Sequence, residues 1–309
     1  MLNLYWKSAG ETRTLIEKPF ASEMDLEKYI YANQDILGDV SIVYRQIRTG
    51  NKQGIPDMLG VDQDARICLI ELKNVVAGED ILPQALGYAI WAETNPDSIK
   101  AIWLESKTRP TEIEIDWDNL DIRVILIAPS FKSTVPRMAT KMGYSIDLVQ
   151  VRRYCFESEE FLLVEFLEEK PQPKPGVTKA KGDWNWEFYA SEHGAEATAQ
   201  FRKTVEAIDA LCKKHGWDLP YNINKGYTGF KRGKKIAFAV VWRATKSWYL
   251  FFKVPRDMAD SFSGKHWKVR TFDTAFNQAI FEPLHPEEPD ISELEPLFVA
   301  AYSQISGKS

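Results

Sequence analysis

The fold is decided by the stretch Gly54-Ile55-Pro56-Asp57-Met58-Leu59-Gly60-Val61, the polar turn Asp62-Gln63-Asp64-Ala65, and the run Arg66-Ile67-Cys68-Leu69-Ile70-Glu71-Leu72-Lys73. Two apolar runs joined by a short polar turn predict adjacent antiparallel strands at 55–61 and 66–72. Because side chains alternate between the two faces of a strand, Glu71 and Lys73 share one face. If the turn is centred on Asp64, Asp57 lies directly opposite Glu71.

This register brings two carboxylates together on one face of a sheet, with Cβ atoms ~4.5–5.5 Å apart. Two unit charges at ~4 Å repel by ~4 kcal/mol at an effective dielectric constant of 20. A sheet keeps such a pair where water solvates it, where one acid is protonated, or where a cation lies between the two. Hard divalent cations such as Mg²⁺ prefer oxygen ligands of this kind.

Lys73 follows Glu71 on the same face, where it can orient a water molecule or meet negative charge that develops on a phosphate. The simpler alternative is an exposed Glu71–Lys73 ion pair near the end of a strand, with Asp57 as a turn residue. The acid-x-lysine pattern taken alone favours that alternative, whereas the spaced aspartate favours a site.

Two predicted helices flank these strands. The first covers residues 22–37, has Ser22 as its N-cap, and carries Glu27 as a third carboxylate, with Glu23 as the alternative. The second covers residues 79–94, and its Gln84 and Tyr88 lie on one helical face because they are four residues apart. Both side chains can contact phosphate or water, or they can pack under the sheet.

Further strands are expected at 40–47, 122–128, 145–156 and 161–167, with a helix near 132–142. The run at 122–128 is apolar throughout, as in a buried strand. Strands interspersed with helices in this order predict an α/β fold with a mixed central sheet flanked by helices.

The chain contains Pro56-Asp57, then thirteen further residues before Glu71-Leu72-Lys73, and then Gln84-Ala85-Leu86-Gly87-Tyr88. This pattern resembles the PD-(D/E)XK nuclease superfamily, and within it the NucS-like (EndoMS-like) and RecB-type endonuclease domains. Residues 25–33 are similar to the first-helix motif of that family, and residues 45–50 to the strand before its catalytic turn. The resemblance covers about residues 20–130 and implies a restriction-endonuclease-like fold.

The resemblance also implies roles for individual residues. Glu27, Asp57 and Glu71 match the metal-binding acids, the carbonyl of Leu72 helps to bind the metal, and Lys73 matches the catalytic lysine. The auxiliary helix positions correspond to Gln84 and Tyr88. The implied activity is metal-dependent endonucleolytic hydrolysis of DNA phosphodiester bonds with Mg²⁺ or Mn²⁺, in DNA repair or in defence against foreign DNA.

A second domain is predicted after the proline-rich stretch Glu168-Glu169-Lys170-Pro171-Gln172-Pro173-Lys174-Pro175-Gly176. Prolines at alternate positions favour extended backbone without helix. The chain is therefore divided into a nuclease domain at 1–168, a linker at 169–182 and a small α+β domain at 183–309. In the last domain a helix is expected at 195–214, strands at 226–230, 235–243 and 247–254, and a helical tail at 291–304.

Charge is distributed unevenly along the chain. The whole protein has a formal net charge of −5, but residues 202–270 contain sixteen basic and five acidic residues, which indicates an anionic partner. Six of the ten tryptophans also follow the linker. The candidate nucleic-acid-binding residues are Lys225, Tyr227, Lys231, Arg232, Lys234 and Lys235. They are interleaved with glycine and aromatic residues, as in a surface that follows a phosphate backbone. The alternative is a solvated hairpin face with the tryptophans in the core.

Several classes of protein are disfavoured. No apolar run approaches the ~18 residues of a membrane span, and the three cysteines form neither a CxxC pair nor a disulfide framework. We therefore expect a soluble, cytoplasmic protein that binds DNA and no membrane. RNA remains open as a substrate, and a homodimer remains open as the assembly. The alternative function is a degenerate nuclease fold that binds nucleic acid or a protein without cleaving.

Overall fold

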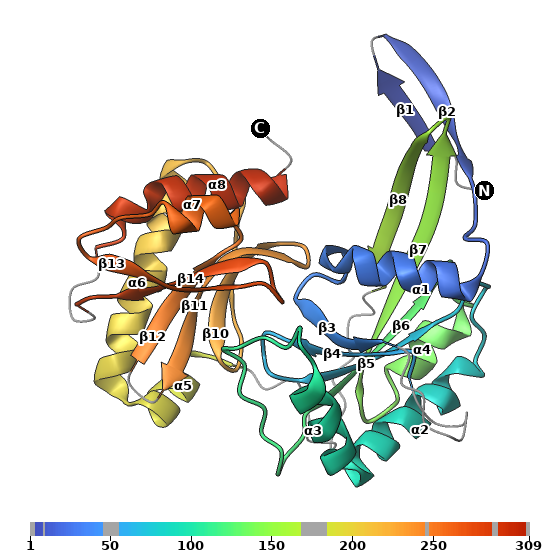
Figure 1. Ribbon diagram of the computed structural model, residues 1–309, viewed down its shortest axis with the longest axis horizontal. Helices are drawn as coiled ribbons and strands as arrows, with labels where there is room; N and C mark the ends of the chain where they lie inside the picture. Colours follow the sequence, from blue (N-terminus) through green and yellow to red (C-terminus); the bar gives the residue numbers. More distant parts are fainter. Residues whose placement is uncertain are drawn as a thin grey trace. The chain divides into compact units, whose positions relative to one another are not determined.

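Figure 1 shows the computed structural model of the protein, which describes residues 4–8, 10–45, 56–167, 184–244, 247–285 and 290–306. The chain divides into two compact units. The first contains most of the chain up to Gly176, and the second contains Val177–Ser309 together with the short segments Leu37–Ser41 and Pro110–Ile113. The predicted linker at 169–182 lies outside the described residues. Among the helices in the described ranges, none has the length and apolar character needed to cross a membrane.

The first unit is built on an eight-stranded mixed sheet in the order β1-β2-β7-β6-β5-β4-β3, with β8 paired to β7. The strands are β1 (Leu4–Ser8), β2 (Glu11–Glu17), β3 (Val40–Arg45), β4 (Met58–Asp62), β5 (Ile67–Leu72), β6 (Ile122–Ala128), β7 (Ser145–Phe156) and β8 (Glu159–Phe166). Strands β5, β6 and β7 run parallel to one another, whereas β4 is antiparallel to β5 and β8 to β7.

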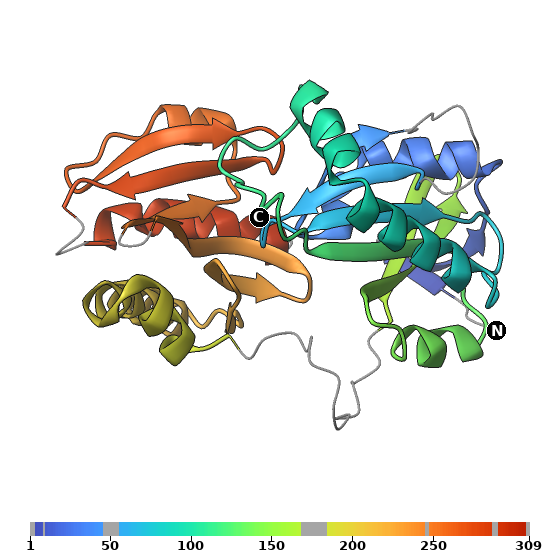
Figure 2. The same ribbon diagram turned by 90° about the horizontal axis from the view of Figure 1, so that it is seen from below.

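Helices cover both faces of this sheet. Helix α1 (Glu23–Ala32) lies on one side, and α2 (Ile81–Thr94), α3 (Pro96–Glu105) and α4 (Thr134–Ala139) lie on the other, as the two views show (Figures 1 and 2). The β1–β2 hairpin and the far ends of β7 and β8 project from the rest of the sheet (Figure 1). A mixed central sheet flanked by helices, accompanied by a second sheet, confirms the predicted fold class.

The central strands form the core of the first unit. Every residue of β4, β5 and β6 is buried, which agrees with the apolar runs that predicted these strands. The β4–β5 ladder pairs Leu59 with Leu69 and Val61 with Ile67, so the predicted hairpin register is confirmed.

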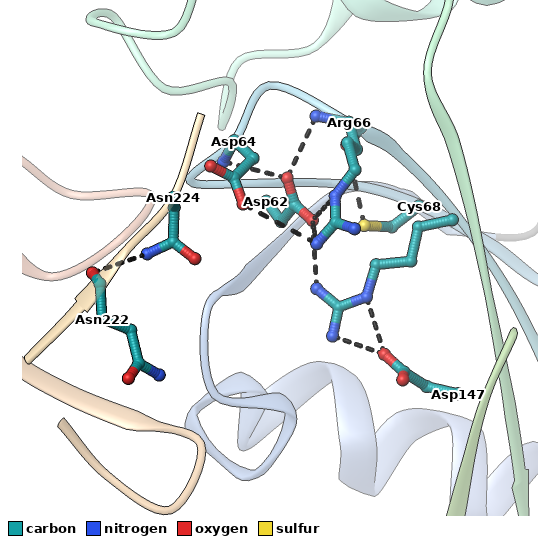
Figure 3. Close-up of polar contacts among 8 residues, drawn as sticks. Asp62, Asp64, Arg66, Cys68, Asp147, Asn222 and Asn224 are labelled. Atoms are coloured by element: carbon teal, nitrogen blue, oxygen red, sulfur yellow. Dashed lines mark hydrogen bonds and ion pairs between the residues drawn. The ribbon is translucent and has the colours of Figure 1, made fainter. Parts of the chain in front are cut away.

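A buried ion network holds the β4–β5 turn in place (Figure 3). Asp62 is fully buried, and its Oδ1 accepts the backbone N–H groups of Asp64 and Arg66, both at 3.0 Å. Its Oδ2 accepts Arg66 Nε at 2.8 Å and an Arg123 nitrogen at 3.1 Å, while Arg123 also pairs with Asp147. Because a buried carboxylate with this many donors permits one turn conformation, the network fixes which residues of β4 and β5 lie opposite each other.

The first helix is shorter than predicted. Ser22 is its N-cap, and the Ser22 hydroxyl accepts the Asp25 N–H at 3.1 Å. The α-helix ends at Ala32 because Asn33 leaves helical geometry, with φ of −126° and ψ of 53°. The chain continues as a 3₁₀ helix at Gln34–Leu37, so the prediction of one helix over 22–37 is wrong from Asn33 onward.

Other elements of the first unit were not predicted. Strand β2 is mostly exposed and polar and pairs with β1 in a hairpin, and α3 follows α2 after a single residue, Asn95. The helix predicted at 132–142 is observed only at Thr134–Ala139.

The second unit contains a six-stranded antiparallel sheet in the order β13-β14-β12-β11-β10-β9. Its strands are β9 (Tyr221–Ile223), β10 (Tyr227–Arg232), β11 (Lys235–Ala244), β12 (Ser247–Phe252), β13 (Trp267–Asp273) and β14 (Gln278–Pro283), and its helices are α5 (Trp186–His193), α6 (Ala195–Lys214), α7 (Arg256–Asp260) and α8 (Glu295–Ser306). Helix α6 matches its prediction at both ends, whereas α5, α7, β9, β13 and β14 were not predicted.

The core of the second unit lies between one sheet face and the helices. Phe201 and Ile208 of α6, and Phe298 of α8, pack in one cluster with Phe238 and Phe252 of the sheet. All five side chains are fully buried. Aromatic rings of this size supply much of the buried apolar area on which a small domain depends.

Candidate active site

Two carboxylates meet beside the central strands of the first unit. Asp57 directly precedes β4, and Glu71 lies in β5. The β4–β5 ladder begins with the pair Met58–Ile70, and continuing its register by one residue places Asp57 opposite Glu71. The backbone N–H of Leu72 donates to Asp57 Oδ2 at 2.9 Å and so connects the two strands at this point. Glu71 is 2% exposed, whereas Asp57 is half-buried.

One oxygen of Glu71 is fully engaged. Glu71 Oε1 accepts Lys73 Nζ at 2.6 Å and Gln84 Nε2 at 2.8 Å. Its other oxygen, Oε2, is buried and has no hydrogen-bond partner. The predicted Glu71–Lys73 ion pair is therefore real, but it is buried on the Glu71 side rather than lying on the exposed surface that the simpler interpretation assumed.

Helix α2 supplies the second donor to Glu71. Gln84 lies in the first turn of α2, from where its amide reaches the end of β5. The same amide nitrogen lies 2.5 Å from the Tyr88 hydroxyl, one helical turn later. Burial and the neighbouring charge of Glu71 raise the pKa of Tyr88, so this phenol stays protonated at neutral pH. The two predicted helix positions are thus brought to the carboxylate pair.

Burial gives the pair its electrostatic character. Burial, followed by the charge of Glu71, raises the pKa of Asp57 from its ordinary value of 3.8 to about 7, against the opposing effects of the Leu72 N–H and Lys73. Burial lowers the pKa of Lys73, but the hydrogen bond and charge of Glu71 outweigh it, so the pKa of Lys73 is raised. The lysine is therefore cationic. When both Asp57 and Glu71 are ionised, Lys73 balances only one of their two negative charges.

The predicted third acid lies on α1. Glu27 is 8% exposed, and its Oε1 lies 3.3 Å from Arg45 Nε. Glu23, the alternative, is close enough for its charge to raise the pKa values of both Asp57 and Lys73. Within the described ranges no three histidine, cysteine or acidic side chains gather as ligands for a metal ion. The structure thus presents the acids as a pair at Asp57 and Glu71.

The donor set of this pair fits a hard divalent cation. Glu71 Oε2 is a buried oxygen without a partner, and Asp57 Oδ2 has a single hydrogen bond, from the Leu72 N–H. Buried carboxylate oxygens are retained where a cation or a proton compensates them. The contribution of the Leu72 amide to the site was missed by sequence reasoning, because a backbone donor leaves no signature in the residue type.

The predicted nucleic-acid-binding residues of the second unit are divided by their exposure. Lys225, Arg232 and Lys235 are exposed, and Lys231 and Lys234 are half-buried. Tyr227 is only 3% exposed and packs in a buried cluster with Val241 and Tyr249, among others, so its predicted place on an exposed surface is wrong. Tyr227 begins the buried part of β10, whereas Arg232 and Lys235 lie at the β10–β11 turn and Lys225 precedes β10 at the other end of the strand.

The tryptophans of the second unit also belong mainly to its core. Trp242, Trp248 and Trp267 are at most 9% exposed. Trp186 and Trp217 are partly buried against the same cluster. The interpretation of these rings as core residues therefore holds over that of a base-stacking platform.

Comparisons with known proteins give similarities to part of the chain. No family model matches the chain, and no curated protein matches it. The chain is similar to an EndoMS–dsDNA2 complex (22% identity, TM-score 0.29, 42% of this chain and 44% of that one) and to a repair endonuclease from Pyrococcus abyssi (24%, 0.28, 43% and 49%). It is also similar to EndoMS in its apo form (22%, 0.29, 43% and 48%). The chain spans less than half the length of each of these structures.

Proposed function

We propose that the protein is a metal-dependent endonuclease that hydrolyses phosphodiester bonds in DNA. The observation that carries this proposal is the buried Glu71 carboxylate, which has one oxygen held by Lys73 and Gln84 and the other unpartnered beside Asp57. A Glu71–Lys73 ion pair with a purely structural role would need neither Asp57 beside it nor a Glu71 oxygen without a partner. Oxygen ligands next to a lysine are the chemistry that phosphoryl transfer uses.

Asp57 and Glu71 would hold Mg²⁺ or Mn²⁺, and the Leu72 carbonyl is the further ligand that the sequence resemblance implies. When bound, such a cation activates water and stabilises negative charge on the phosphate. Lys73 is cationic and directly hydrogen-bonded to Glu71, so it places a positive charge where a phosphate oxygen would become more negative. Gln84 keeps the Glu71 carboxylate in one orientation.

The second unit would contribute to nucleic-acid binding through its exposed basic side chains. Lys225, Arg232 and Lys235 are exposed, and their region carries the excess of positive charge along the chain. Contacts of this kind are independent of sequence and weaken as the salt concentration rises. The proposed partner is therefore DNA, held by phosphate contacts.

Cleavage of labelled DNA in Mg²⁺ or Mn²⁺ tests the proposal. The wild type is compared with Asp57→Asn and Lys73→Met, and Asp118→Asn is the matched control because Asp118 is an exposed carboxylate in the same unit. We expect cleavage by the wild type and the control, and a loss of at least ~10²-fold in the other two variants. Equal cleavage by all four proteins would overturn the assigned site.

The substrate panel separates the alternatives. Single-stranded, duplex and branched DNA, each paired with an RNA of the same sequence, identify the sugar and the strand geometry that the site accepts. A protein that binds these substrates with a strong salt dependence but cleaves none of them in Mg²⁺ or Mn²⁺ would be a binding module, and the proposed hydrolysis would be wrong.

A further inference from the structure

Strand β7 carries polar side chains on the face that bears the carboxylate pair. The parallel ladders pair Glu71 with Leu126 of β6 and Leu126 with Leu148 of β7, without a register shift. Since partners in a ladder point to the same face and alternate residues return to it, Gln150 and Arg152 share the face of Glu71 and Lys73. The intervening residues, Val149 and Val151, are buried on the opposite face.

The position along the sheet follows from the same register. The backbone N–H of Lys73 donates to the carbonyl of Ile127, which extends the ladder to the row of Lys73, Ala128 and Gln150. Two strand spacings of ~4.8 Å put the backbones of Lys73 and Gln150 ~10 Å apart, and Arg152 lies ~7 Å further along β7. Leu126 and Ala128, between the two sites on this face, are fully buried, so a bound strand would pass along the ends of β5 and β6 rather than over the sheet. A long side chain at Arg152 lies within a few nucleotides of the carboxylate pair along that path.

Arg152 is the unusual residue on this face, because no acidic side chain pairs with it within the described residues. Its Nε is buried without a hydrogen-bond partner, and within the described residues its guanidinium makes one hydrogen bond, from a terminal nitrogen to Gln150 Oε1 at 3.2 Å. Two acids lie diagonally across the strands from Arg152, Glu165 opposite Gln150 and Glu17 opposite Tyr154, and both are exposed. Neither forms an ion pair with Arg152 among the described residues.

The next residue provides the contrast. Arg153 points to the opposite face, and each of its three guanidinium nitrogens donates a hydrogen bond: to the carbonyls of Lys18 and Pro19, both at 3.0 Å, and to Glu160 at 3.2 Å. Arg153 therefore has a structural role in holding the chain before α1. A half-buried guanidinium that lacks such partners costs free energy unless an anion or water satisfies it.

We propose that Gln150 and Arg152 form a second phosphate-binding subsite on the face of the carboxylate pair, which holds a phosphate that flanks the bond to be cleaved. The inference rests on the proposed function for the identity of its ligand, a nucleic-acid strand. The planar guanidinium presents a fork of donors that matches two phosphate oxygens, and a contact to Gln150 Oε1 holds that fork on the sheet. Arg152 acts here as a positioning residue.

Binding of a 12-nucleotide thymidine oligomer in EDTA tests the subsite, with fluorescence anisotropy measured over a range of KCl concentrations. The wild type is compared with Arg152→Gln and Arg152→Lys, and Arg137→Gln is the matched control, since Arg137 is exposed on α4 and its replacement changes the net charge equally. We expect Arg152→Gln to bind ~10–100-fold more weakly and to lose ~0.7 from the slope of log K against log salt. Arg152→Lys recovers the slope but only part of the affinity.

A second measurement does not depend on nucleic acid. The thermal midpoint is followed as inorganic phosphate replaces chloride at constant ionic strength, and phosphate is expected to stabilise the wild type and Arg137→Gln more than Arg152→Gln. Equal stabilisation of all three, or an equal loss of oligomer affinity in Arg152→Gln and Arg137→Gln, would overturn the subsite. A wild type that cleaves no substrate but shows the Arg152-dependent phosphate response would refute the proposed function and leave the subsite standing.

Discussion

The replacement Asp57→Asn is expected to stabilise the protein in the absence of metal. Burial and Glu71 raise the pKa of Asp57 to about 7, compared with 3.8 for the ordinary group. A group with a raised pKa in the folded state binds its proton more tightly there than in the unfolded chain. Folding therefore takes up a proton between these two pH values, and stability falls as the pH rises from 3.8 through about 7.

The size of the effect follows from the same difference. At ~1.4 kcal/mol for each pKa unit, the ionised Asp57 costs the folded state at most ~4 kcal/mol above pH 7. Asparagine has the same shape and keeps an oxygen for the Leu72 N–H, but it carries no charge beside Glu71. Allowing for the burial of an amide, we expect Asp57→Asn to be ~2–4 kcal/mol more stable than the wild type at pH 8, with the difference disappearing near pH 4.

The measurement must report on the first unit alone, because a chain of two units does not unfold in one step. Urea titrations in EDTA at pH 4.5 and pH 8 are combined with amide hydrogen exchange of peptides from β4 and β5, which report the opening of the sheet. Asp118→Asn is the control for removal of an exposed carboxylate. Addition of Mg²⁺ at pH 8 should stabilise the wild type and narrow its difference from Asp57→Asn.

Two results would refute this reasoning. One is an Asp57→Asn protein that is no more stable than the wild type at pH 8. The other is a stability difference of the same size at pH 4.5 and pH 8, because a shift that does not depend on pH cannot come from the titration of Asp57.

Three further predictions concern other contacts. Lys73→Met should lower the cleavage rate by ~10²-fold or more while oligomer affinity changes little, since in the proposed function the lysine acts through its charge at the reacting phosphate; single-turnover rates and anisotropy measure the two quantities. Asp62→Asn should destabilise the first unit by ~3–5 kcal/mol, because Arg123 would keep its buried charge with one fewer carboxylate, and hydrogen exchange of β5 checks this. Phe201→Ala should cost the second unit ~3–5 kcal/mol, seen in its own urea transition, and leave exchange in β5 unchanged.

Local sequence was sufficient for the hairpin that carries the carboxylates. The alternation of side chains and the polar turn predicted that Asp57 lies opposite Glu71, and the observed ladder has that register. Register in a hairpin depends on the turn and on a few neighbouring side chains, all within some fifteen residues, so it is available without knowledge of the rest of the chain. Strand β6 was predicted correctly from its continuous apolar run, which is also a local signal.

Local sequence was insufficient where a boundary or an exposure depends on distant residues. The first helix stops at Asn33, in the middle of a stretch with helical spacing, and the 3₁₀ turn that follows is held partly from β3, where the Ile42 N–H donates to Gln34. Tyr227 lies in a segment rich in lysine and glycine, yet its strand turns the ring into a buried cluster. Charge and composition describe a segment, whereas burial is set by what packs against each face.

The sequence by itself therefore determined the two carboxylates, their register and the lysine beside them, because these depend on short-range pairing within one hairpin. Only the tertiary structure decided how those groups are engaged: Gln84 reaches Glu71 from α2, Glu27 pairs with Arg45, and the second oxygen of Glu71 is left buried without a partner. The row from Lys73 to Gln150 likewise exists only because β5, β6 and β7 run parallel as neighbours. Parallel pairing joins strands that are far apart along the chain, so no pattern within either strand encodes it.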